Sequence, residues 1–252
     1  MDYNFFTDRN EALAYLLDKY DISNTGRIAD STLPEIVPAV LQTERGNVTL
    51  FPWRAERRFI ELKNIIEQHT LEDISTLRFC RLDSSDRSSL DRLIYQELDL
   101  CEWLGDSTIK RIFAVFNGEY AANIIVKLEN GISCSVECCV MLSADADIVD
   151  RHEIIARRGV ASDRVVDTQL PQSSITLFTK KDEQCFTDID AEIFGLSEND
   201  IHVVRAAFNV LQNPQAIERL NSRHKRLMEL VEVAKQSEIT NKVSVVEGVV
   251  QL

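Results

Sequence analysis

Cysteine and histidine are the side chains best suited to metal or nucleophilic chemistry, and three cysteines lie close together in this sequence. Cys134, Cys138 and Cys139 are near enough along the chain to suggest a metal site. Residues 138 and 139 point to opposite faces of a strand, however, so the three thiols do not converge on one ion. All six cysteines lie within apolar runs, which is typical of reduced thiols in a core. We therefore predict no metal site.

The four histidines also lack a pattern that indicates chemistry. They lie on unrelated elements, without a paired carboxylate or metal-ligand spacing in the sequence: His69, His152, His202 and His224. We interpret all four as structural.

A nucleotide site would need glycines, and the eight glycines form neither G-x-G-x-x-G nor G-x-x-x-x-G-K-[ST]. A pyrophosphate requires close backbone approach at a helix N-terminus, which bulky side chains prevent. The sequence therefore predicts no cofactor.

Composition narrows the classes of function. The chain has 252 residues, is 44% hydrophobic and carries a formal net charge of -13. Nucleic-acid binding depends on Lys and Arg that neutralise phosphates, so this acidity argues against a nucleic-acid partner. No window reaches the roughly 20 apolar residues that span a bilayer, and the N-terminus lacks the order of a signal peptide, so we expect a cytoplasmic protein without membrane contact.

Hydrophobic periodicity predicts the elements that must position any site. Residues 1–50 contain two expected helices (11–20 and 33–41) and a strand (48–51), like a truncated α/β remnant of a doubly wound, Rossmann-like domain. Within 51–252, helices are expected at 54–69, 89–104, 197–211 and 217–234. Strands are expected at 74–82, 109–116, 121–128, 132–138, 153–156, 164–166, 174–178, 185–186 and 242–246. This pattern predicts an α+β domain, a largely antiparallel open sheet of sequential strands with helices on one face.

The hairpin at 121–142 specifies its own register. A loop over 129–131 with Gly131 at positive φ pairs Val126 with Cys134 and Ile124 with Val136, which places apolar side chains in one column. A two-residue loop would instead oppose apolar and polar side chains. The other face carries a mixed set: Ile125, Lys127, Ser135, Glu137, Cys139 and Met141.

The order of several motifs over residues 50–247 resembles the second domain of the Gfo/Idh/MocA oxidoreductase family. The stretch VTLFPWRAERRFIELKNIIEQHTLEDISTLRF resembles its strand, Arg-containing helix and return strand. LIYQELDLCEWLGD resembles a helix with the pattern H-x-x-D-hydrophobic-x-x-W-L-G, and LENGISCSVECCVML resembles the central hairpin. HEIIARRGVAS and RHKRLMELVEVAKQSEITNKVSVV resemble the following strand and the closing helix and strand.

Departures from the family pattern concern the residues that handle the proton. The resemblance implies a Lys within E-K-P and a D-x-x-x-H helix motif, but Arg92 and Gln96 occupy the Asp and His positions here, and LFPW at 50–53 has no lysine. Neither Gln nor Arg titrates near neutral pH. Asp99 matches the acid of H-x-x-D, and either lines the old pocket or pairs on its helix. Gln96 either binds a sugar-like hydroxyl or is a surface residue, and Arg54 either contacts an anionic ligand or is an exposed cation. The ligand-pocket candidates are thus Arg54, Arg92, Gln96 and Asp99.

These departures favour a non-catalytic, small-ligand-binding or oligomerising module. The alternative is an NAD(P)-dependent oxidoreductase of sugar-like substrates whose cofactor domain comes from a partner chain. The resemblance implies homo-oligomers formed through the open sheet face that bears the mixed hairpin set. A third class is a structural or regulatory subunit that docks onto a full-length family relative, which the missing Lys, His and glycines also favour.

Overall fold

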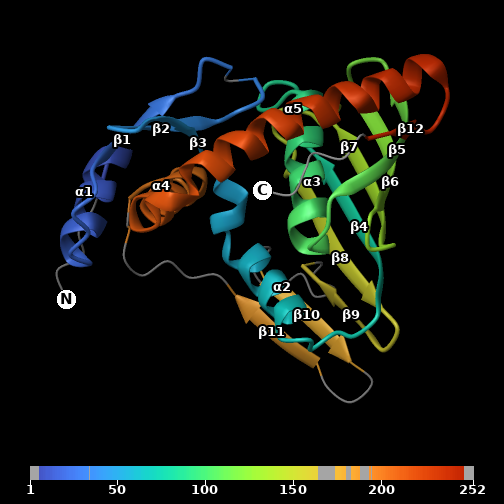
Figure 1. The fold of residues 1–252 in the computed structure, drawn as a ribbon, viewed down its shortest axis with the longest axis horizontal. Helices are drawn as coiled ribbons and strands as arrows, with labels where there is room; N and C mark the ends of the chain where they lie inside the picture. Colours follow the sequence, from blue (N-terminus) through green and yellow to red (C-terminus); the bar gives the residue numbers. More distant parts are fainter. Residues whose placement is uncertain are drawn as a thin grey trace. The chain divides into compact units, whose positions relative to one another are not determined.

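The computed structural model describes residues 6–33, 35–163, 174–179, 183–187, 193 and 195–246 (Figure 1). Its elements in chain order are α1 (Arg9–Lys19), β1 (Gly26–Asp30), β2 (Ala39–Thr43), β3 (Gly46–Thr49), the 3-10 helix η1 (Pro52–Ala55), α2 (Arg57–Glu67), β4 (Ile74–Leu82), α3 (Leu90–Gly105), β5 (Ile109–Asn117), β6 (Ala121–Leu128), β7 (Ser133–Cys139), β8 (Val149–Ala156), β9 (Gly159–Ser162), β10 (Ser174–Thr179), β11 (Glu183–Thr187), α4 (Glu198–Gln212), the 3-10 helix η2 (Pro214–Ala216), α5 (Ile217–Thr240) and β12 (Ser244–Val245).

The chain forms two compact units that interleave in sequence. Unit 1 consists of Met1–Ile60 with Asp188–Arg226, and unit 2 of Glu61–Thr187 with Leu227–Leu252. The α+β class is confirmed. The predicted domain boundary after residue 50 stays a prediction. It states which part of the sequence resembles the family, whereas the two compact units have other boundaries.

Unit 1 packs α1 and α4 against a three-stranded sheet in the order β1-β2-β3. Both strand pairs are antiparallel, whereas a doubly wound domain has a parallel sheet. The predicted helix at 33–41 is wrong. Pro38 has no N–H and disfavours helical geometry at Val37, so a turn ends there and β2 begins, with Ala39 and Leu41 buried on one face.

Unit 2 is built on a nine-stranded sheet in the order β11-β10-β9-β8-β4-β7-β6-β5-β12. The prediction of sequential strands fails at β4, which lies between β7 and β8 and pairs parallel with β7 and antiparallel with β8. Strand β4 has buried side chains on the α3 side and partners on both edges, which suits a central strand. The predicted strand at 164–166 lies outside the described residues.

The hairpin register is confirmed residue by residue. Val126 pairs with Cys134, Ile124 with Val136 and Ile125 with Ser135. Gly131 has a φ of 93°, and the Leu128 N–H donates to the Ile132 carbonyl at 2.9 Å, which closes the three-residue loop.

Helix α3 covers one face of this sheet and packs on β4, β6 and β7 (Figure 1). The last turns of α5 are tied to β5 by the buried Ser237, whose hydroxyl accepts from the Ala114 N–H at 3.1 Å and donates to the Lys242 carbonyl at 2.7 Å. None of the described helices is long and apolar enough to cross a membrane.

Candidate functional site

Helix α3 carries three of the four predicted ligand-pocket residues on one stripe. It begins after Ser89, whose hydroxyl accepts from the Arg92 N–H at 3.2 Å and so caps the first turn. Residues four and three apart share a helix face, so Arg92, Gln96 and Asp99 form what we call the α3 stripe.

The α3 stripe is more deeply buried than its polar sequence suggests. Gln96 is only 5% exposed, so the surface interpretation of this residue is wrong, and Asp99 is fully buried. The Gln96 Nε2 has no hydrogen-bond partner among the described residues. Burial, together with the nearby charge of Arg81, lowers the pKa of the half-buried Arg92. Helix packing on the sheet therefore leaves α3 with unsatisfied polar capacity.

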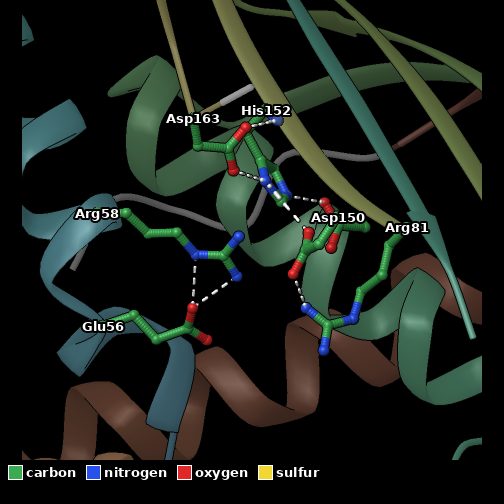
Figure 2. A network of polar contacts seen from close by, with 7 residues as sticks. Glu56, Arg58, Arg81, Asp150, His152 and Asp163 are labelled. Carbon is green, nitrogen blue, oxygen red and sulfur yellow. Dashed lines mark hydrogen bonds and ion pairs between the residues drawn. The ribbon is translucent and has the colours of Figure 1, made fainter. Parts of the chain in front are cut away.

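Glu97 directly follows Gln96 on a different face of α3. It belongs to a buried cluster that we call the His152 cluster: Glu97, Asp150, His152 and Asp163. The His152 Nε2 lies 2.9 Å from Glu97 Oε2, and its Nδ1 lies 2.7 Å from Asp163 Oδ2 and 3.3 Å from Asp150 Oδ1. The His152 backbone N–H also donates to Asp163. Figure 2 shows Asp150 and Asp163 around the ring.

The sheet brings this cluster together. Asp150 and His152 lie two apart on β8 and so share a face, with β4 beside them placing Arg81 opposite Asp150 and Phe79 opposite His152. Arg81 donates to Asp150 Oδ2 at 2.5 Å, and the rings of Phe79 and His152 are 4.9 Å apart. Because His152 lies between three carboxylates, the prediction that it has no paired carboxylate is wrong.

Electrostatics keep the His152 ring charged in this environment. Burial opposes the imidazolium, but the carboxylates of Glu97, Asp163 and Asp150 outweigh it and raise the pKa of His152 to about 10. Glu97 and His152 have no exposed side-chain surface. Sequence spacing could indicate only the Asp150–His152 pair on β8, because Glu97 comes from α3 and Asp163 follows β9.

The fourth predicted pocket residue, Arg54, belongs to unit 1 and is not part of the α3 stripe. It lies in η1, with its guanidinium 5.1 Å from the centre of the Phe51 ring. Arg54 lines a unit 1 cavity of about 450 Å³, together with Arg219 and the amide side chains of Asn209, Asn213 and Gln215. The same segment holds an internal ion pair, in which Arg58 Nη2 lies 2.6 Å from Glu56 Oε2 (Figure 2).

The predicted interface residues lie on the sheet face opposite α3, which we call the open face. Ile125 is 53% exposed, and Val115 and Met141 are also exposed. Lys127 donates to Ser133 Oγ at 3.1 Å and to the Gly131 carbonyl, so it is held at the hairpin end. Cys80 on β4 pairs with Glu137 on β7. Burial and the charge of Glu137 raise the pKa of the Cys80 thiol to about 12. The cysteines whose side chains the structure describes are all free thiols.

Comparison with known proteins identifies the fold. No model of a known protein family matches the sequence, and no curated protein matches it. Levoglucosan dehydrogenase, solved with NADH and levoglucosan, matches 79% of this chain and 66% of its own at 12% identity and a TM-score of 0.65. An inositol dehydrogenase homolog from Azotobacter vinelandii, solved with NADH and myo-inositol, matches 78% of this chain and 63% of its own at 11% identity and a TM-score of 0.60.

A third structure, a myo-inositol dehydrogenase from Corynebacterium glutamicum ATCC 13032, matches 79% of this chain and 64% of its own, at 12% identity and a TM-score of 0.57. The chain therefore spans 63–66% of the length of these three proteins.

These structures contradict the prediction of no cofactor, because two of them are NADH complexes and so point to nucleotide binding in this fold. The described residues of this chain do not by themselves form a dinucleotide cradle. The strands β1–β3 are antiparallel, and the glycines with positive φ lie singly in separate turns: Gly46, Gly118, Gly131 and Gly195.

The fold itself follows from both the ordered motifs and the structural matches. The nine-stranded sheet, its covering helix α3 and the closing helix α5 lie in the stretch that the motifs span. This chain has the Gfo/Idh/MocA-type oxidoreductase fold.

Proposed function

We propose that this chain is a non-catalytic protein that binds a small ligand and assembles with copies of itself. The observation that supports this proposal most directly is the α3 stripe. Arg92 and Gln96 stand where the family resemblance implies the proton-handling Asp and His, and neither exchanges a proton near neutral pH. General acid–base catalysis needs a group whose pKa lies near the working pH.

The cavity in unit 1 supports the binding part of this proposal and indicates the class of ligand. Guanidinium groups pair with carboxylates and phosphates, and amide side chains bond hydroxyl groups. The cavity has two guanidinium and three amide side chains on its lining, and its volume of about 450 Å³ suits a small molecule. A small hydroxylated anion, such as a sugar acid, matches these groups.

A second candidate function is an NAD(P)-dependent oxidoreductase of sugar-like substrates, with part of the cofactor site supplied by a partner chain. The NADH complexes among the similar structures favour it. The non-catalytic proposal therefore excludes turnover of a substrate and makes no claim about nucleotide binding.

A turnover assay separates the two candidates. The purified chain is incubated with NAD⁺ or NADP⁺ and with myo-inositol, levoglucosan or a hexose, alone and with a full-length dehydrogenase of this fold whose own catalytic lysine and histidine are replaced. The proposal expects no formation of reduced nicotinamide above the enzyme-free blank in any mixture. Substrate-dependent reduction that requires this chain would overturn the non-catalytic proposal and establish the oxidoreductase.

A further inference from the structure

The His152 cluster contains a buried carboxylate oxygen without a partner. Glu97 uses Oε2 to contact His152, while its Oε1 has no hydrogen-bond partner among the described residues, although the side chain has no exposed surface. A buried carboxylate oxygen that loses water without gaining a partner destabilises the folded state. The arrangement therefore favours an additional electropositive group beside Glu97.

The charges in direct contact within the cluster point the same way. Three carboxylates face one imidazole, and Asp150 also pairs with Arg81. With the ring protonated, these contacts join three carboxylates to two cations, His152 and Arg81. With a neutral imidazole, a divalent cation together with Arg81 would neutralise the three carboxylates.

The geometry points to a divalent metal site, suited to zinc, in which Glu97, Asp150 and the His152 Nε2 are the ligands and Asp163 orients the ring. One ligand atom from each of the three residues lies within 4.8 Å of the others. Ligands of tetrahedral zinc sit about 2.0–2.2 Å from the ion and hence about 3.4 Å apart. The Glu97–His152 contact of 2.9 Å needs to lengthen by only about half an ångström.

Asp163 supplies the orientation that a metal-binding histidine requires. It accepts from both the backbone N–H and the ring Nδ1 of His152, which fixes the ring and leaves Nε2 directed at Glu97. A carboxylate on one ring nitrogen and a metal on the other is the common arrangement around zinc, and it makes the imidazole a stronger ligand.

The donor set also indicates which ion would bind. One imidazole nitrogen and two carboxylate oxygens suit zinc, whereas Ca²⁺ and Mg²⁺ prefer oxygen alone. Asp150 and its partner Arg81 have side chains that are 14% and 15% exposed, so the cluster is nearest to solvent on their side.

The wild-type chain tests the site without any substitution. Protein treated with a chelator and dialysed is titrated with Zn²⁺ by calorimetry, and its metal content is measured by mass spectrometry. We expect one equivalent with a Kd below about 1 µM. Co²⁺ then reports the ligands, because a site of one nitrogen and two oxygens gives visible bands without the intense sulfur-to-cobalt bands of thiolate ligation. No binding by the chelated wild type, or cobalt bands of the thiolate type, would overturn the assignment.

Three variants locate the bound ion. Glu97→Gln removes a ligand, and Asp163→Asn changes only the orienting group and should weaken binding by about 10–100-fold, less than Glu97→Gln does. Glu153→Gln is the matched control, because Glu153 lies on the other face of β8 in an exposed ion pair with Arg78 and should leave the affinity unchanged. Circular dichroism confirms that each variant is folded. Equal affinity in Glu97→Gln and wild type would place the ion elsewhere and overturn the site.

Discussion

At the scale of single residues, the two arginines of the unit 1 cavity can be tested individually. Replacing Arg54 or Arg219 by Gln keeps a polar side chain but removes the charge that would pair with an anion. We expect either variant to lose the thermal stabilisation that a saturating sugar acid such as glucuronate gives the wild type. A charge-assisted hydrogen bond contributes about 1.5–3 kcal/mol, so affinity should fall by about 10-fold or more.

Arg57→Gln is the matched control for this experiment. Arg57 is exposed at the start of α2, three residues after Arg54, and it does not line the cavity. If Arg57→Gln lowers the stabilisation as much as Arg54→Gln, the effect is one of net charge and the cavity is not the binding site.

The sequence predicted that α3 lacks the proton-handling Asp and His of the family motif, but it did not predict the His152 cluster. Arg92 and Gln96 could be assigned to the Asp and His positions of the family motif from spacing alone, since both lie on one helix. The His152 cluster could be predicted only in part, because Asp150 stands two residues from the histidine but Glu97 and Asp163 stand 55 and 11 residues away. The pairing of β8 with β4 and β9, and the packing of α3 on β4, bring these groups within hydrogen-bond distance.

At the scale of elements, the end of α3 shows why a glycine follows Trp103 and Leu104. The sequence predicted Gly105 as the residue just past the helix, but it is the last helical residue, and Asp106 takes the left-handed cap with a φ of 48°. A Cβ on Gly105 would lie 2.2 Å from Leu128 Cδ1. An alanine at position 105 would therefore force the buried Leu128 side chain on β6 to move.

Gly105→Ala should destabilise the protein by about 1–3 kcal/mol through overpacking. Urea unfolding followed by circular dichroism measures the change in the free energy of unfolding. Leu128→Ala provides the control, because it removes the side chain that the new methyl group would meet. The double variant should be more stable than the sum of the two single effects predicts, by about 0.5–3 kcal/mol. Simple additivity would show that the clash with Leu128 is not the cause.

Local elements were predictable wherever their signals were local. The hairpin register followed from Gly131 and the alternation of apolar residues, and α4 followed from its Ser197 cap. The position of β4 in the sheet was not predictable, because nothing within 74–82 records that its partners are β7 and β8. Residues 33–41 were misassigned because apolar spacing was weighted above Pro38, whose missing N–H favours the turn.

At the scale of the whole molecule, the open face is the surface through which we expect copies of the chain to associate. A symmetric interface would bring Ile125 near its own copy. Ile125→Lys would place like charges across that interface while leaving the buried Ile124 side of β6 unchanged. Light scattering coupled to size exclusion should show the wild type as a dimer or larger, and the variant shifted toward a folded monomer.

Ile239→Lys is the matched control, because Ile239 is 73% exposed on α5 and not on the sheet. It introduces the same charge in place of the same side chain and should leave the molecular mass unchanged. A wild type that is monomeric at high micromolar concentration, or a control that dissociates equally, would contradict assembly through the open face.

The insertion of β4 between later strands also constrains how the protein can be made. As the chain leaves the ribosome, β4 emerges about 50 residues before β7 and still earlier than β8. At about 5–20 residues per second, its two edges stay unpaired for several seconds while β5, β6 and β7 can already form consecutive hairpins. The centre of the sheet is thus completed only after the β5–β6 hairpin can form, and the unpaired edges of β4 are those that a chaperone would protect during synthesis.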